Sequence, residues 1–296
     1  MPLNYFVVDV FSETAFQGNP LAVVFDTVQL STEKMQSIAR EFNLSETTFV
    51  QRRSAEHERA EGVRVRIFTT QEELNFAGHP TLGTASVLKL QAPETVIDNT
   101  VTLALNVGPV PVRFSGAGLY GEMTQRDPGF GAELARAHVA QLIGLEADDL
   151  DPALTPQVVS TGTAFAIVAL RSAAALSRLR VNQEAATPWL REHGARWFYV
   201  LGPDTLATNN QPAWRARMQF YGGEDPATGS AAGCAISYLV AHNVVASGQQ
   251  IHVRQGVEIG RTSDLFLSAK IISAKVTNVR VGGSTVSVAS GHIFQP

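Results

Sequence analysis

The pattern of apolar positions predicts many short strands and few helices. Apolar residues recur at helical spacing from Met35 to Phe42, behind Ser31 and Thr32, either of which can cap a helix. Further helices are predicted at 81–90, 132–143, 173–179, 184–193 and 230–242, and a charged hairpin loop at 52–62. Runs of strand character occupy 4–10, 21–25, 47–51, 63–69, 100–105, 110–114, 158–160, 164–170, 196–201, 215–221, 250–254, 264–272, 275–281 and 285–289. Strands outnumber helices too heavily for a doubly wound parallel sheet, so the predicted class is α+β.

One strand–turn–helix pattern occurs twice. The run 63–69 leads to Gly78 and a small-residue helix, and the run 215–221 leads to Gly229 and a second such helix. The offset 229 − 78 = 151 also places Ser86 on Ser237. This shared order predicts a duplicated unit and therefore two similar domains. We place them at 1–118 and 119–283, with 284–296 as a segment that can return to the first domain.

Both glycines stand where a helix begins, and such starts favour anions. The first N–H groups of a helix lack partners, and the helix dipole is positive there. Asp225 lies just before the second start, so a carboxylate stands beside a site suited to a substrate carboxylate. That arrangement is typical of proton-transfer enzymes. From the residues alone, Asp225 is equally a helix cap or turn former, and Glu46 and His79 are equally polar turn residues.

Composition excludes several function classes. Hydrophobic residues make up 45% and charged residues 17% of the chain, which suits a folded protein with an ample core. The net charge of −4 offers no attraction for nucleic acid or an anionic membrane. We find no signal peptide, no apolar stretch long enough to span a membrane and one cysteine, Cys234, so a cytoplasmic location is expected.

The sequence lacks the motifs of cofactor-dependent and metal-dependent enzymes. The chemistry that it predicts is therefore acid/base catalysis that uses neither a cofactor nor a metal. No phosphate-binding loop and no cluster with metal-ligand spacing occurs in the sequence. Ser230 lacks the flanking pattern of a nucleophile elbow, so it is expected to donate a hydrogen bond. Cys234 lies in the second small-residue helix, where a free cysteine usually packs as a buried hydrophobe.

Several blocks of the chain resemble the phenazine-biosynthesis PhzF-like family. They are Asn43–Val50, Phe76–Pro80 and Glu224–Ser230, together with Gln17–Pro20 and Gln255–Arg261, and they extend over nearly the whole chain in the family's order. The resemblance implies the diaminopimelate epimerase-like fold. That fold has two pseudo-symmetric domains, each a mostly antiparallel sheet rolled around a central helix, with the active site between them.

The resemblance also implies roles for individual residues. The family's proton-shuttling glutamate matches Glu46, and other active-site residues match His79, Asp225 and Ser230, so Glu46, Asp225 and His79 are predicted as catalytic. The predicted substrate-binding residues are Asn19, Gly78, Thr228, Gly229 and Ser230. A small carboxylate substrate and a homodimer are expected, with no nucleic acid or membrane partner.

The implied reaction is an allylic isomerisation of a carboxylated, cyclic amino or hydroxy acid. Better-known epimerases of this fold use two thiols, each just before the glycine of the repeat. The matching positions are Ala77 and Thr228 (77 + 151 = 228), and neither is cysteine, so two-thiol racemisation is not available. The run 218–223 is short and aromatic, whereas phenazine-pathway members have a longer Pro/Gly loop at this place. The resemblance therefore does not assign the substrate of those members to this chain.

Two alternatives stay open at this point. One is an amino-acid epimerase or racemase that uses Glu46 and Asp225 in place of thiols. The other is a protein that binds metabolites on the same fold without turnover.

Overall fold

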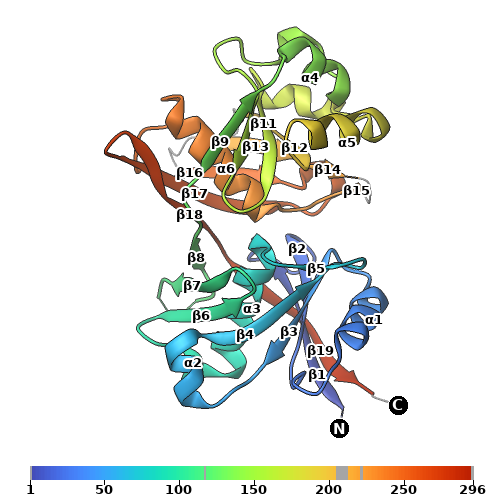
Figure 1. Cartoon of the computed structure of the whole chain (residues 1–296), viewed down its shortest axis with the longest axis vertical. Helices are drawn as coiled ribbons and strands as arrows, with labels where there is room; N and C mark the ends of the chain where they lie inside the picture. The colour runs from blue at the N-terminus through green and yellow to red at the C-terminus, as the bar shows by residue number, and fades with distance from the viewer. Residues whose placement is uncertain (1, 117, 205–212, 221–222, 295–296) are drawn as a thin grey trace. The chain divides into compact units, whose positions relative to one another are not determined.

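The computed structural model describes residues 2–116, 118–204, 213–220 and 223–294. The chain divides into two compact units, one formed by residues 1–124 and 282–296 and the other by residues 125–281 (Figure 1). The first unit therefore contains both ends of the chain. The sequence places the corresponding boundaries at 118/119 and 283/284.

The first unit is a mixed sheet rolled around one helix. Its strands are β1 (Leu3–Val10), β2 (Asn19–Val24), β3 (Glu46–Gln51), β4 (Val63–Phe68), β5 (Glu73–Leu74), β6 (Thr100–Leu105), β7 (Gly108–Phe114), β8 (Gly121–Thr124) and β19 (Thr285–Ile293), and its helices are α1 (Thr32–Phe42), α2 (Ala55–Glu61) and α3 (Gly78–Gln91), with a 3₁₀ turn at Pro93–Thr95. The strands pair in the order β19–β1–β2–β3–β4–β6–β7–β8, with β5 on β4. The pairs β2–β3 and β4–β6 are parallel and the others antiparallel.

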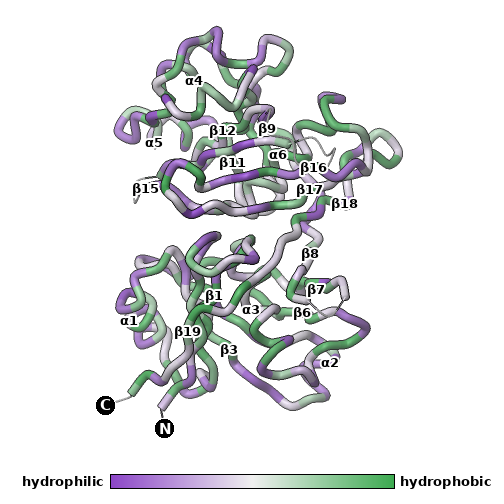
Figure 2. Tube along the Cα trace, turned by 180° about the vertical axis from the view of Figure 1, so that it is seen from behind, coloured by the Kyte–Doolittle hydropathy of each residue, from purple (hydrophilic) through white to green (hydrophobic). Residues whose placement is uncertain are grey.

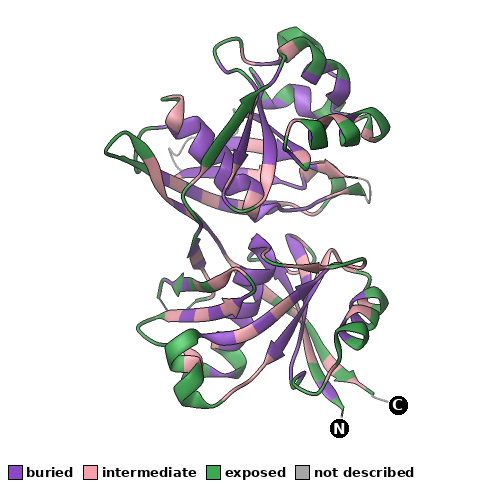
Figure 3. Ribbon diagram, viewed as in Figure 1, coloured by how far each residue is buried: buried purple, intermediate pink, exposed green. Residues whose placement is uncertain are grey.

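Helix α3 is the centre of this unit. It packs against β1, β2, β3, β6, β7, β8 and β19, and every residue from Gly78 to Leu88 is buried (Figure 3). Helix α1 covers another part of the sheet, where Met35, Ile38 and Ala39 join a core cluster with strand residues. The predicted helix at Met35–Phe42 and its cap Ser31 are confirmed, because the Ser31 side chain accepts a hydrogen bond from the Lys34 N–H.

The second unit repeats this plan around helix α6 (Gly229–Ala241). Its other elements are β9 (Gly129–Glu133), β10 (Gln157–Ser160), β11 (Ala164–Ala169), β12 (Trp197–Pro203), β13 (Ala213–Arg217), β14 (Gln219–Phe220), β15 (Gly223–Glu224), β16 (Ile251–Gln255), β17 (Ser263–Ile272), β18 (Lys275–Gly283), α4 (Arg136–Ile143) and α5 (Gln183–Glu192), with 3₁₀ turns at Ala147–Asp149, Ala173–Arg178 and Val257–Ile259. The strands β9–β10–β11–β12–β13–β16–β17 pair in that order. Helix α6 packs against β10, β11 and β17, and it is hydrophobic along most of its length (Figure 2).

Two predicted elements were wrong in kind, and a third began at the wrong residue. The charged segment 52–62 is not a hairpin loop but contains α2, which buries no residue and so carries no apolar periodicity. It is held instead by the Ser54 cap and by ion pairs such as Arg52–Glu58. The predicted helix 132–143 begins only at Arg136, because β9 precedes it, and the predicted helix 173–179 is a 3₁₀ helix.

A glycine permits the close approach of α3 to β1 and β2. A β-carbon at Gly83 would lie 2.6 Å from Val10 Cγ2 and 2.7 Å from Leu21 Cδ2, both fully buried. We expect Gly83→Ala to lower the free energy of unfolding by about 1–3 kcal/mol, despite the better helix propensity of alanine. Chemical denaturation followed by circular dichroism measures this. Gly118→Ala is the control, since a β-carbon there meets nothing within 4 Å, and equal stability of both variants would contradict the expectation.

Candidate active site

Three elements of the first unit begin with predicted site residues. Asn19 opens β2, Glu46 opens β3, and His79 is the second residue of α3. Strands β2 and β3 are parallel neighbours with Leu21 opposite Glu46, so the first residues of both strands lie side by side at the same end. The turn into β3 follows Asn43, which ends α1 in the left-handed conformation with φ 51°. The fold therefore brings Asn19, Glu46 and His79 together.

The imidazole of His79 lies between the other two side chains. Asn19 Nδ2 is 3.2 Å from His79 Nδ1, and His79 Nε2 is 3.4 Å from Glu46 Oε2. Because the Asn19 amide donates through Nδ2, Nδ1 is the acceptor and the neutral ring carries its proton on Nε2, toward Glu46. Burial lowers the pKa of His79 to about 3, so the ring is neutral near pH 7. His79 Nε2 faces Glu46 Oε2 at 3.4 Å but makes no hydrogen bond to it, and the neutral ring does not act as a base there.

The two central helices begin where the repeat predicts. Helices α3 and α6 start at Gly78 and Gly229, and the residues before them, Ala77 and Thr228, make no side-chain cap. Their first N–H groups are therefore suited to an anion. The helix starts are confirmed, whereas carboxylate binding at Gly78 and Gly229 stays a prediction.

Asp225 is held just before α6 by hydrogen bonds on both its main chain and its side chain. Its N–H donates to the Met218 carbonyl at 3.0 Å, and its carbonyl accepts from Gln255 Nε2 at 2.8 Å. Its carboxylate Oδ2 accepts from Thr228 Oγ1 at 2.6 Å, a length typical of a hydroxyl bonded to an ionised acceptor. The structure thus joins Asp225 to Thr228 and adds Gln255, which the sequence did not single out as a site residue. The available signal was a buried strand ending in a glutamine and then a glycine.

The remaining predicted residues of the second unit lie on α6. Ser230 is half-buried, and its carbonyl accepts from Thr161 Oγ1 at 3.5 Å. Cys234, one turn further on, is buried, and burial raises the pKa of its thiol to about 11. Its Sγ lies 3.6 Å from Thr161 Oγ1. The thiol is therefore neutral and packed in the core.

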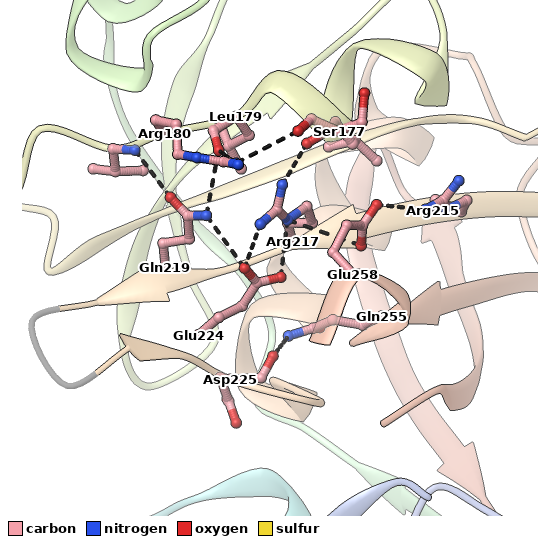
Figure 4. Close-up of polar contacts among 12 residues, drawn as sticks. Ser177, Leu179, Arg180, Arg215, Arg217, Gln219, Glu224, Asp225, Gln255 and Glu258 are labelled. Atoms are coloured by element: carbon pink, nitrogen blue, oxygen red, sulfur yellow. Dashed lines mark hydrogen bonds and ion pairs between the residues drawn. The ribbon is translucent and has the colours of Figure 1, made fainter. Parts of the chain in front are cut away.

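A buried ion-pair network adjoins Asp225 through its neighbour Glu224 (Figure 4). Arg217 binds Glu224 with two hydrogen bonds, Nε to Oε1 at 2.9 Å and Nη2 to Oε2 at 2.5 Å. Arg217 Nη1 also donates to the Leu176 carbonyl at 2.6 Å, and Gln219 Nε2 donates to Glu224 Oε2 at 3.2 Å. Glu258 pairs with Arg215 and lies 3.8 Å from Arg217 Nε. This network anchors the chain that enters the Asp225 turn.

The described residues lack two features that would point to other functions. No group of three or more His, Cys, Asp or Glu side chains in this part of the chain is placed to hold a metal ion. Within the same residues, no helix combines the length and the apolar character needed to cross a membrane.

Comparison with known proteins places the chain in a family. The profile described as "Phenazine biosynthesis-like protein" matches residues 8–291, so the chain belongs to the phenazine biosynthesis-like (PhzF) family. A relative from Pseudomonas aeruginosa, named trans-2,3-dihydro-3-hydroxyanthranilate isomerase, is 36% identical over 297 residues, which cover 98% of this chain and 99% of that protein.

Solved structures agree with the predicted fold class. A phenazine biosynthesis protein of the PhzF family from Bacillus anthracis has a TM-score of 0.86 at 25% identity, with all of both chains covered. A hydroxyproline epimerase from Agrobacterium vitis has a TM-score of 0.66 at 10% identity, covering 99% of this chain and 92% of that one. The similarity to the hydroxyproline epimerase concerns the fold only. The α+β, epimerase-like fold is thereby confirmed.

The neutral state of His79 gives a pH dependence with a definite sign. The unfolded chain protonates this histidine below about pH 6.5, whereas the folded chain resists protonation down to a pKa of about 3. The contribution to stability is complete above pH 6.5 and is lost as the pH falls toward 3. Between about pH 7 and 5 we expect the wild type to lose about 2 kcal/mol more of its unfolding free energy than His79→Gln does. Denaturation at both pH values tests this, and parallel losses in the two proteins would contradict it.

The Arg217–Glu224 pair is 5% and 7% exposed at its side chains, so removing one partner leaves a buried charge. We expect Arg217→Met to lower the free energy of unfolding by about 3–5 kcal/mol. The double variant Arg217→Met/Glu224→Leu should recover most of that loss, because no unpaired charge remains. A double variant as unstable as the sum of the two single variants would argue against this account, and urea titration measures all four proteins.

Proposed function

We propose that the protein is a cofactor-independent isomerase that moves a proton within a small carboxylated, cyclic amino or hydroxy acid. The observation that carries the proposal is the arrangement at Glu46, whose carboxylate faces a buried, neutral His79 at 3.4 Å. The isomerase name and full-length similarity of the Pseudomonas aeruginosa relative support the same reaction class. They also make trans-2,3-dihydro-3-hydroxyanthranilate the first substrate to test.

In the proposed reaction, Glu46 removes a proton from a carbon of the substrate. The C–H electron pair moves into the conjugated system, the double bonds shift, and Glu46 returns its proton to another carbon. One C–H bond is broken and one is formed, so the step needs no oxidant or reductant. The neutral His79 ring beside the Glu46 carboxylate does not compete for the proton, because a ring with so low a pKa is a poor acceptor.

The other predicted residues bind the substrate in this proposal. Each of the helix starts, at Gly78 and at Gly229, is suited by its N–H groups to bind a carboxylate of the substrate. Asp225 receives a substrate amine or hydroxyl, and Ser230 donates a further hydrogen bond. Asn19 holds the His79 ring through Nδ1 and so acts on the substrate only indirectly.

The decisive experiment follows deuterium from solvent into trans-2,3-dihydro-3-hydroxyanthranilate by mass spectrometry. We expect the wild type to incorporate deuterium as it isomerises the substrate, because the proton held on the Glu46 carboxyl group exchanges with solvent before it is returned. Glu46→Gln should be slower by at least about 100-fold, because it cannot take up a proton. Glu41→Gln is the matched control, since Glu41 lies exposed on α1, and it should retain the wild-type rate.

The alternatives predict different outcomes of this experiment. Incorporation with loss of optical rotation and no isomer would indicate an epimerase. A bound but unchanged substrate would indicate a protein that binds metabolites without turnover. Undiminished exchange in Glu46→Gln would overturn the proton shuttle itself.

A further inference from the structure

The side chain of Gln255 makes four hydrogen bonds around Asp225 and Thr228. Its Oε1 accepts from Tyr199 Oη and from the Thr228 N–H, both at 3.1 Å. Its Nε2 donates to the Asp225 carbonyl at 2.8 Å and to Thr228 Oγ1 at 2.9 Å. Gln255 is fully buried, so all four positions of its amide are satisfied by protein groups.

The main chain decides which way this amide points. A backbone N–H can only donate, so the Thr228 N–H requires Oε1 of Gln255. A backbone carbonyl can only accept, so the Asp225 carbonyl requires Nε2. A flipped amide would set donor against donor and acceptor against acceptor in a buried place, which is costly.

The amide orientation in turn decides the direction of the Thr228 hydroxyl. Because Nε2 of Gln255 already donates to Thr228 Oγ1, the single hydroxyl proton is left for Asp225 Oδ2, 2.6 Å away. Asp225 must therefore accept at this oxygen. A carboxylate does so, and so does a carboxylic acid whose proton is on Oδ1, so the bond fixes the role of Oδ2 as an acceptor.

The residue after Gln255 is shaped to the same turn. Gly256 has φ 76°, and a β-carbon there would lie 2.3 Å from the Arg261 carbonyl oxygen and 2.8 Å from the Pro226 carbonyl oxygen. The chain therefore passes the Asp225–Pro226 turn too closely for any side chain. This close passage holds the Gln255 amide at bonding distance from the turn.

We infer that Gln255 is a positioning residue that, through the Thr228 hydroxyl, holds Asp225 Oδ2 as a hydrogen-bond acceptor and fixes the orientation of this carboxyl group, which thereby favours ligands that offer it an amine or hydroxyl donor. The inference rests on the proposed function for the role of Asp225 as a ligand-binding group. Beyond that role, Gln255 influences which ligands Asp225 prefers, and it does so through the Thr228 hydroxyl.

Two ligands that cannot isomerise separate this role from turnover. 3-Hydroxyanthranilate carries a carboxylate, an amine and a hydroxyl, and benzoate carries the carboxylate alone. By titration calorimetry we expect the wild type to bind 3-hydroxyanthranilate at least about tenfold more tightly than benzoate. Absence of this preference would overturn the inference.

Two substitutions interrupt the hydrogen bonds from Gln255 to Thr228 and from Thr228 to Asp225 in different ways. Thr228→Val removes the hydroxyl at nearly constant shape, and Gln255→Glu replaces the donating nitrogen with an oxygen. Each should weaken 3-hydroxyanthranilate binding by about tenfold and benzoate binding by less than about twofold. Thr228→Ser should retain the wild-type preference, and the double variant Thr228→Val/Gln255→Glu should be no weaker than Thr228→Val, since Gln255 acts through Thr228.

The control removes a buried tyrosine hydrogen bond elsewhere in the same unit. Tyr238 Oη donates to the Thr155 carbonyl at 2.7 Å, and Tyr238→Phe should leave both affinities unchanged. Equal losses for both ligands in Thr228→Val, or additive losses in the double variant, would refute the positioning role. Glu46→Gln should keep the ligand preference, so failure of the isomerase proposal and failure of this inference give different results.

Discussion

The structure depends on the burial of two helices at the centre of two rolled sheets. A helix can be buried on all sides only if its residues are small where neighbouring segments come close, and Gly83 of α3 and Gly233 of α6 meet that condition. A β-carbon at Gly83 would collide with Val10 and Leu21, and one at Gly233 would lie 1.9 Å from Gln125 Oε1. Because the strands surround each helix, its N-terminal end has one defined position. The predicted site residues His79 and Ser230 lie at these ends.

Burial of these helix ends fixes the charge and the hydrogen-bond roles of the side chains there. His79 is surrounded so completely that its ring stays neutral, and its proton is directed by Asn19 toward Glu46. In the second unit, burial fixes the direction of each hydrogen bond of Gln255. A donor left without an acceptor there could not bond to water, and this would cost free energy. Each unit thus presents one carboxylate, Glu46 or Asp225, whose neighbours have fixed donor and acceptor roles.

The sequence predicted the features that depend on local chemistry or on the repeat. The helix starts at Gly78 and Gly229, the cap at Ser31 and the α+β class all follow from residue type and spacing. Helix α2 was missed because it faces water throughout and is held by charges such as Arg52 and Glu58, which leave no apolar period.

The site was predictable in part for the same reason. Asn19, Glu46, His79 and Asp225 stand in recognisable turns. Gln255 is 27 residues from Thr228 and 30 from Asp225 along the chain, and only strand pairing brings them together. The sequence analysis assigned no role to Arg217 or Glu224, because their burial as a pair depends on the fold. Long-range contacts of this kind have no signature in a single sequence.

The pairing of β19 with β1 has a consequence for the order of events during synthesis. Residues 125–281 form a complete unit, whereas the first unit waits for Thr285–Ile293 before β1 gains its second neighbour. On the ribosome, the unit encoded in the middle of the chain can therefore finish folding while the unit encoded first still lacks a strand. Until translation reaches β19, one edge of β1 lacks its strand neighbour, and an exposed strand edge is a template for pairing with other chains.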